Sequence, residues 1–122
     1  MIQPTDSELE ILKVLWKEGP SSVRKVNEIL SKEKEIGYTT TLKFMQLMHE
    51  KGLLDRDTSQ RSHIYAPLVK EKDTKGSLLN NFMNAAFEGS ASQLILQALG
   101  NNKMSDDELL EIKELIKKLE NQ

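Results

Sequence analysis

Apolar residues recur at intervals of three and four in three stretches of the N-terminal half, and this is the repeat of an amphipathic helix. The first stretch opens with Thr5 and Glu8, whose spacing is that of a capping box, and it ends before Gly19 and Pro20. Its apolar positions are Leu9, Leu12, Leu15 and Trp16. The pattern predicts a first helix between these two signals.

The second stretch predicts a helix that begins at Ser21 or Ser22 and fades over residues 33–36. Serine is a favoured N-cap residue because its hydroxyl accepts a hydrogen bond from an otherwise unpaired backbone amide. The apolar face of this helix consists of Val23, Val26, Ile29 and Leu30.

The third stretch predicts a helix that begins after Tyr38, with Thr39 or Thr40 as its N-cap, and that ends near Gly52. One side of this helix carries Thr41, Phe44, Met45 and Met48, which we expect to face a core. The other side carries Thr39, Lys43, Gln46 and Glu50.

After Gly52 the helical repeat gives way to two short, strand-like segments, residues 53–57 and 62–66. A turn-rich segment, residues 58–61, separates them, and Pro67 is expected to end the second. Three short helices followed by a hairpin is the element order of a winged helix-turn-helix. We therefore expect a mainly α fold with a small β-wing.

The C-terminal half is helical in pattern again, beyond a polar stretch at residues 70–76 that we interpret as a linker. Its last helix opens with a second capping box, formed by Ser105 and Glu108. Three short amphipathic helices are too small for an independent core, so burial against a second copy is the simplest solution. The residues expected to form this dimer interface are Leu78, Phe82, Leu94, Leu109, Ile112, Ile116 and Leu119.

Charge divides the chain in the same way. Residues 1–72 carry 12 basic and 11 acidic side chains, whereas residues 73–122 carry 5 basic and 8 acidic ones. An acidic half is an unfavourable surface for DNA. We therefore predict a DNA-binding domain at residues 1–70 and a helical dimerisation domain at residues 71–122.

Composition excludes several classes of protein. The chain has no cysteine and two histidines, His49 and His63, so disulfides, zinc ribbons and thiol catalysis are excluded and no metal or cofactor is expected. No nucleophile elbow, phosphate loop or metal-ligand spacing is present, so we do not expect an enzyme. The N-terminus is polar and no apolar run approaches the ~18–20 residues of a membrane span, so we expect a cytoplasmic protein without membrane insertion.

The order and spacing of five motifs resemble the penicillinase repressor (BlaI/MecI) family of winged-helix transcriptional repressors, which also includes the copper-responsive CopY branch. The motifs are Thr5-x-x-Glu8 through Leu15-Trp16; Ser22-Val23-Arg24-Lys25-Val26; Tyr38-Thr39-Thr40 leading to Lys51-Gly52-Leu53; Arg56, Arg61 and Tyr65-x-Pro67; and Ser105-Asp106-Asp107-Glu108-Leu109. The resemblance spans nearly the whole chain. It implies a homodimeric repressor on a dyad operator upstream of resistance or stress genes.

The resemblance also implies a further partner, a membrane sensor protease that cuts the dimer domain in response to a β-lactam. The chain departs from the family at that position, where Gln97-Ala98 replaces the usual Asn-Phe pair. The cysteine cluster that binds metal in the copper branch is absent, and Leu47 stands where the family commonly has arginine. Release from DNA by cleavage elsewhere, by a small ligand or by a partner protein all stay open.

Contacts to DNA are expected from the polar side of the third helix, since a recognition helix reads the major groove. The candidates for base contacts are Thr39, Thr40, Lys43 and Gln46. Ser22, Arg24 and Lys25 are candidates for phosphate contacts, and Arg61 at the wing tip for the minor groove or backbone. The alternative reading is that these residues are only helix caps and a solvated face, in a winged helix that binds protein instead of DNA.

Overall fold

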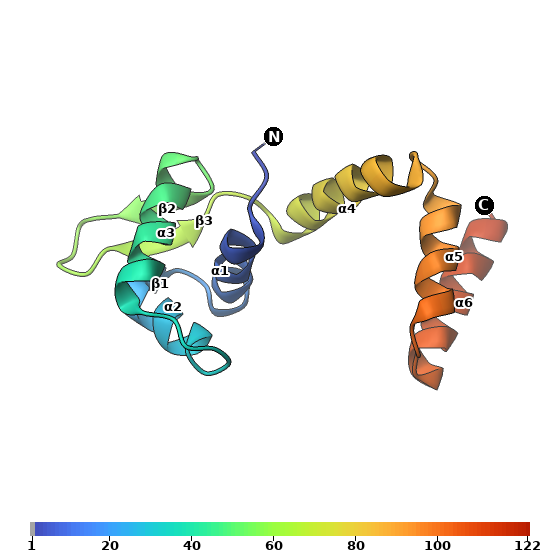
Figure 1. Cartoon of the computed structure of the whole chain (residues 1–122), viewed down its shortest axis with the longest axis horizontal. Coiled ribbons are helices and arrows are strands. Elements are labelled where there is room, and N and C mark those ends of the chain that lie inside the picture. The colour runs from blue at the N-terminus through green and yellow to red at the C-terminus, as the bar shows by residue number, and fades with distance from the viewer. Residues whose placement is uncertain (1) are drawn as a thin grey trace. The chain divides into compact units, whose positions relative to one another are not determined.

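The computed structural model describes residues 2–122 and shows six helices and a three-stranded sheet in them (Figure 1). In chain order the elements are α1 (Asp6–Glu18), β1 (Ser21–Ser22), α2 (Val23–Leu30), α3 (Tyr38–Glu50), β2 (Leu54–Asp57), β3 (Ile64–Pro67), α4 (Glu71–Phe87), α5 (Ala91–Asn101) and α6 (Asp106–Glu120). The chain divides into two compact units, one ending at Leu79 and the other comprising Asn80–Gln122. The predicted fold class, mainly α with a small β-wing, is confirmed.

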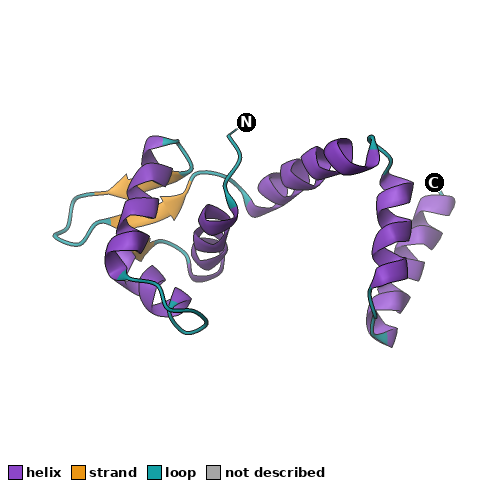
Figure 2. Ribbon diagram, viewed as in Figure 1, coloured by secondary structure: helices purple, strands orange, loops and turns teal. Residues whose placement is uncertain are grey.

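The antiparallel sheet has the strand order β1-β3-β2 (Figure 2). β2 and β3 form the expected hairpin, in which Arg56 pairs with Tyr65 and Asp57 with Ile64. β1 was not predicted, because Ser21 and Ser22 were assigned to the start of a helix. Ser21 pairs with Tyr65 across the sheet, and Ser22 both ends the strand and caps α2.

The core of the N-terminal unit lies between α1, α2, α3 and the sheet. Tyr65 in the middle strand is almost completely buried, and Met45 and Met48 face inward from α3, as their spacing predicted. The indole of Trp16 packs against this core and donates a hydrogen bond of 3.0 Å to the carbonyl of Val69. The other core residues are Ile11, Leu12, Leu15, Val23, Val26, Leu53 and Leu54.

The start of α3 differs from the prediction. The helix begins at Tyr38 and its N-cap is Gly37, which makes no side-chain cap hydrogen bond. Thr39 and Thr40 lie inside the first turn with exposed side chains, so neither is the cap. α2 ends at Leu30, earlier than expected, because residues 31–34 form turns that hydrogen-bond back to its last carbonyls.

The polar stretch at residues 70–76 is not a linker, and from Glu71 onward it forms the first turns of α4. Lys75 Nζ lies 2.6 Å from Glu71 Oε2, an ion pair at the four-residue spacing that supports a helix. Thr74 is buried although its neighbours are exposed. The charged composition of this segment therefore reflects an exposed helix surface.

The C-terminal unit has the expected helices but no core. The second capping box is present, with the backbone amide of Glu108 donating to Ser105 Oγ at 3.1 Å. Not one residue from Asn80 to Gln122 is buried. The pairs of elements with extensive mutual contacts all belong to the segment from α1 to β3.

Candidate nucleic-acid interface

α3 exposes a continuous arc of side chains on the side away from Met45 and Met48. This arc contains all four base-contact candidates together with three further exposed residues, Tyr38, Leu47 and Glu50. The four candidates are Thr39, Thr40, Lys43 and Gln46, and all are exposed. The arc is thus the part of α3 available to a partner.

One flank of the arc borders a groove of about 300 Å³ between α3, the start of α2 and the wing. Four of the predicted contact residues line it together: Ser22, Arg24, Gln46 and Arg61. They come from three elements that are up to 39 positions apart in the sequence. The groove is also lined by Tyr38 and by Ser62 and His63 of the wing, polar residues that were not predicted as contacts.

The other flank carries a second hollow of similar volume, about 300 Å³, on the surface of α3 itself. Thr39, Thr40 and Lys43 line it, together with Phe44 and Leu47. The structure therefore divides the predicted residues between two neighbouring hollows. Lys25 lines neither of the two, and its Nζ lies 3.9 Å from Glu18 Oε1.

The cap of α2 brings a helix N-terminus to the groove. Ser22 Oγ accepts a hydrogen bond of 3.2 Å from the amide of Lys25, so the serine is occupied as the N-cap. Backbone amides at the start of a helix and the positive end of its dipole favour an anion. Because Arg24 lies in the first turn of α2 and lines the groove, this end of the groove is suited to a phosphate group.

A partly buried polar network connects α3 to α2. Asn27 Nδ2 lies 3.0 Å from Thr41 Oγ1 and 3.0 Å from the carbonyl oxygen of Ile36, and it donates to both. Thr41 Oγ1 in turn donates to the carbonyl of Gly37 at 3.4 Å. The sequence reasoning missed Asn27, although a polar residue four positions after Val23 on an apolar helix face was a signal. The network holds the loop before α3 and so sets where the exposed arc begins.

The far end of α3 is held to α1 by an ion pair. Lys51 Nζ lies 2.8 Å from Glu8 Oε2, and only 2% of Glu8 is exposed. Burial raises the pKa of Glu8. The hydrogen bonds from Lys51 and Thr5 and the charge of Lys51 together lower the pKa by more than burial raises it, so the net shift is downward. Gly52 follows with a φ of 85°, and the amides of Gly52 and Leu53 close the helix in a Schellman motif.

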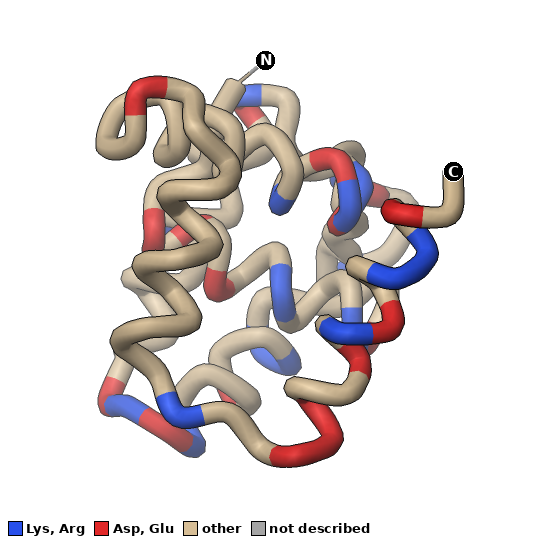
Figure 3. Tube along the Cα trace, turned by 90° about the vertical axis from the view of Figure 1, so that its right-hand side faces the viewer, with Lys and Arg blue, Asp and Glu red and all other residues tan. Residues whose placement is uncertain are grey.

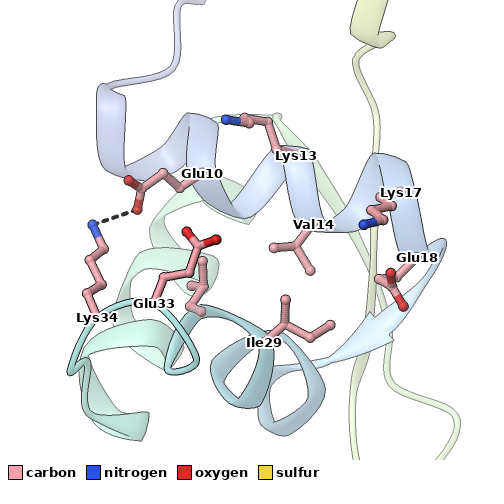
Figure 4. Close-up of a pocket in the computed structure, with 9 residues that line it drawn as sticks. Glu10, Lys13, Val14, Lys17, Glu18, Ile29, Glu33 and Lys34 are labelled. Carbon is pink, nitrogen blue, oxygen red and sulfur yellow. Dashed lines mark ion pairs between the residues drawn. The ribbon is translucent and has the colours of Figure 1, made fainter.

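A larger hollow, of about 500 Å³, lies between α1 and α2 (Figure 4). Val14 and Ile29 point toward each other across it, and charged side chains of both signs surround them. Lys34 Nζ and Glu10 Oε2 are 2.7 Å apart at its edge. It contains none of the residues predicted to contact DNA, and its mixed charge does not suit a polyanion.

The residues predicted for dimerisation lie on the C-terminal helices with much of their apolar surface uncovered. Phe82, Ile116 and Leu119 are 56%, 48% and 57% exposed, Leu109 is also exposed, and Leu78, Leu94 and Ile112 are half-buried. Further exposed apolar residues that the prediction did not include are Leu79, Ile95, Leu96, Leu110 and Leu115. Charge is unevenly placed, since α5 has no charged residue whereas α6 carries both acidic and basic ones (Figure 3).

Throughout residues 2–122 no three side chains of the kind that bind metal ions come together. No helix in the described part of the chain is both long and apolar enough to cross a membrane.

Comparison with known proteins gives a consistent result. The family model described as penicillinase repressor matches residues 4–118. The chain is 27% identical over 119 residues to the penicillinase repressor of Bacillus licheniformis, covering 98% of this chain and 93% of that one. It is 25% identical over 114 residues to the methicillin resistance regulatory protein MecI of Staphylococcus aureus (strain N315), covering 93% of each. Lactococcus lactis ZitR, a solved structure, has a TM-score of 0.48 at 20% identity, over 98% of this chain and 75% of that one.

Proposed function

The chain belongs to the penicillinase repressor family, a family of transcriptional regulators, and on this premise we propose that it is a sequence-specific DNA-binding repressor that acts as a homodimer on a dyad operator. The observation that carries the proposal is the exposed arc of α3, which is bordered by arginines from two other elements, Arg24 of α2 and Arg61 of the wing. A helix bordered in this way presents base-reading groups beside phosphate-binding groups.

In the proposed complex α3 lies in the major groove. Gln46 pairs with adenine through its amide, and Lys43 reaches guanine or a phosphate. The start of α2, with Ser22 and Arg24, holds a phosphate of one strand, and Arg61 contacts the backbone or the minor groove beside the wing. Lys25 is not assigned a direct contact, because its ammonium group lies 3.9 Å from Glu18 Oε1, whose charge offsets its own.

The dimer is proposed from the state of the C-terminal unit. No residue from Asn80 to Gln122 is buried, and Phe82, Leu96 and Ile116 are about half or more exposed, so helices in this state are not stable alone in water. A second copy covers these side chains with an identical surface, as a two-fold axis requires. We accordingly assign DNA binding to residues 1–70 and dimerisation to residues 71–122.

The proposed targets are resistance or stress genes, since the relatives in the comparison are named for penicillinase and methicillin resistance. Release by a membrane sensor protease is not part of the proposal. The position that aligns with the family's cleavage pair is Gln97-Ala98, and it lies within α5.

The test is a selection from random duplexes at physiological salt, followed by titration of the enriched site. We expect a dyad with half-sites about one or two helical turns apart. The double variant Lys43→Ala/Arg61→Ala is expected to lose at least about tenfold in affinity and to lower the slope of log K against log salt by about 1–2.

The matched control is Lys13→Ala/Lys17→Ala, which removes the same charge from the hollow between α1 and α2. Equal affinity of the two double variants would contradict the interface. Failure to enrich any duplex, with a folded and dimeric protein, would favour the winged helix as a protein-binding module. The near balance of 12 basic and 11 acidic side chains in residues 1–72 is the observation on the side of that second reading.

A further inference from the structure

The hollow on the flank of α3 has a different chemistry from the groove beside the wing. It is lined by Thr39, Thr40, Lys43, Phe44 and Leu47, and most of its surface is apolar. Leu47 is 40% exposed and is no part of the buried core, whereas Phe44 packs partly against that core. The hollow is therefore an apolar surface within an otherwise polar arc.

The position of Leu47 in the arc distinguishes it from an ordinary exposed leucine. Thr39, Lys43 and Leu47 follow one another at four-residue intervals, so they form one row along the exposed side of α3. The core side of the same helix is already supplied by Thr41, Met45 and Met48, which are completely buried. Leu47 thus faces whatever the row of Thr39 and Lys43 faces.

If α3 lies in the major groove of DNA, the chemical groups in the groove determine what Leu47 can contact. The edges of the bases present hydrogen-bonding groups at every base pair, and the 5-methyl group of thymine is the apolar feature among them. A leucine in the row has no hydrogen-bonding group to offer a base edge or a phosphate. A methyl group seated between Leu47, Phe44 and Thr40 loses its contact with water and leaves no polar group unpaired.

We propose that Leu47, Phe44 and Thr40 form a receptor for the 5-methyl group of a thymine in each half-site of the operator. The inference rests on the proposed function and adds a specificity-determining residue to it. Recognition of that base pair depends on apolar contact, in place of the paired hydrogen bonds that Gln46 makes. Lys43, at the rim of the hollow, contacts the base or phosphate next to this thymine.

The experiment is a uracil scan of the selected operator. Each thymine in turn is replaced by deoxyuridine, which lacks only the methyl group, and the dissociation constant is measured at fixed salt. We expect one position per half-site at which the replacement weakens binding about fourfold, the value for burial of one methyl group. Replacement in both half-sites is expected to weaken binding about 15-fold, if the two contributions are independent.

The scan is repeated with Leu47→Ala and with a control, Leu68→Ala, which shortens an exposed leucine outside the hollow. Leu47→Ala is expected to bind the uracil and thymine operators equally well, while Leu68→Ala discriminates as the unaltered protein does. Since Leu47 lies outside the core, thermal unfolding should be unchanged.

The inference is overturned if no thymine is sensitive to uracil, or if Leu47→Ala retains the discrimination. In both cases the protein still binds its operator, so the proposed function survives. Failure of the proposed function is seen earlier and separately, because the selection then enriches no duplex to scan.

Discussion

The two units of this chain differ in what their apolar residues do. In the N-terminal unit Leu12, Met45 and Tyr65 meet in a closed core, and the sheet is completed by β1. In the C-terminal unit no residue is buried, and the apolar side chains of α5 and α6 lie along exposed helix faces. The N-terminal unit buries its apolar side chains within a single chain, whereas the C-terminal unit leaves its apolar side chains exposed.

This difference fits the proposed division of function, with DNA recognition in the N-terminal unit and dimerisation in the C-terminal unit. A domain that recognises DNA must hold Gln46, Arg24 and Arg61 at fixed spacing. The closed core and the hydrogen bond between Asn27 and Thr41 provide that rigidity in the N-terminal unit. A dimerisation module gains from the opposite state, because apolar surface that stays uncovered in the monomer is available to drive association. If the proposed function holds, we expect operator binding to require both units.

The largest expected effect on stability comes from a substitution in the core of the N-terminal unit. Leu12 is fully buried, so Leu12→Ala should lower the free energy of unfolding of the N-terminal unit by about 2–5 kcal/mol. The loss should be the same at low and high protein concentration, since the core lies within one chain. Urea unfolding at two concentrations measures this, and a concentration-dependent loss would show that the core is shared between chains.

The next prediction concerns the exposed apolar residues of the C-terminal unit. Ile116→Lys places a charge in the exposed apolar row of α6, and Glu114→Lys places the same side chain about 200° around the helix. We expect the first variant to be monomeric in sedimentation and to lose about 100-fold or more in operator affinity, because two linked half-sites become independent. The second should stay dimeric. A dimeric Ile116→Lys variant would remove α6 from the interface.

Two kinds of feature that depend on neighbours in the sequence, the capping boxes and the orientation of α3, were predicted correctly, whereas the N-cap of α3 was not. Both capping boxes, at Thr5 and at Ser105, are local patterns whose partners lie three positions away. The orientation of α3 followed from the helical repeat, which placed Met45 inward and Lys43 outward. β1 was missed because Ser21–Ser22 has no apolar alternation and becomes a strand only through its pairing with β3.

The candidate site was predicted as a set of residues but not as an arrangement. Lys43 shares a hollow with Leu47 because the two lie four positions apart on α3, and the helical repeat predicts this. That Gln46 shares a groove with Arg61, in contrast, depends on where the wing lies beside α3. No spacing in the sequence carries this information. Asn27 was missed for a related reason, since its hydrogen-bond partners belong to the loop before α3 and to α3 itself.

The smallest expected effect compares the two capping boxes. The pKa values of Glu8 and Glu108 are both below the ordinary value, so each carboxylate stabilises the fold above that value and loses its contribution as the pH falls through its lowered pKa. Glu8 is buried and bonded to Lys51, whereas Glu108 is exposed and is held by the amide and hydroxyl of Ser105. Glu8→Gln should therefore flatten the acid limb of the stability curve of the N-terminal unit clearly, and Glu108→Gln should change that of the C-terminal unit only slightly. Thermal unfolding between pH 3 and pH 7 (roughly the range in which carboxylates titrate) measures both. Equal effects would mean that the ion pair between α1 and α3 contributes nothing beyond the cap, and that the closed unit is held by its apolar core alone.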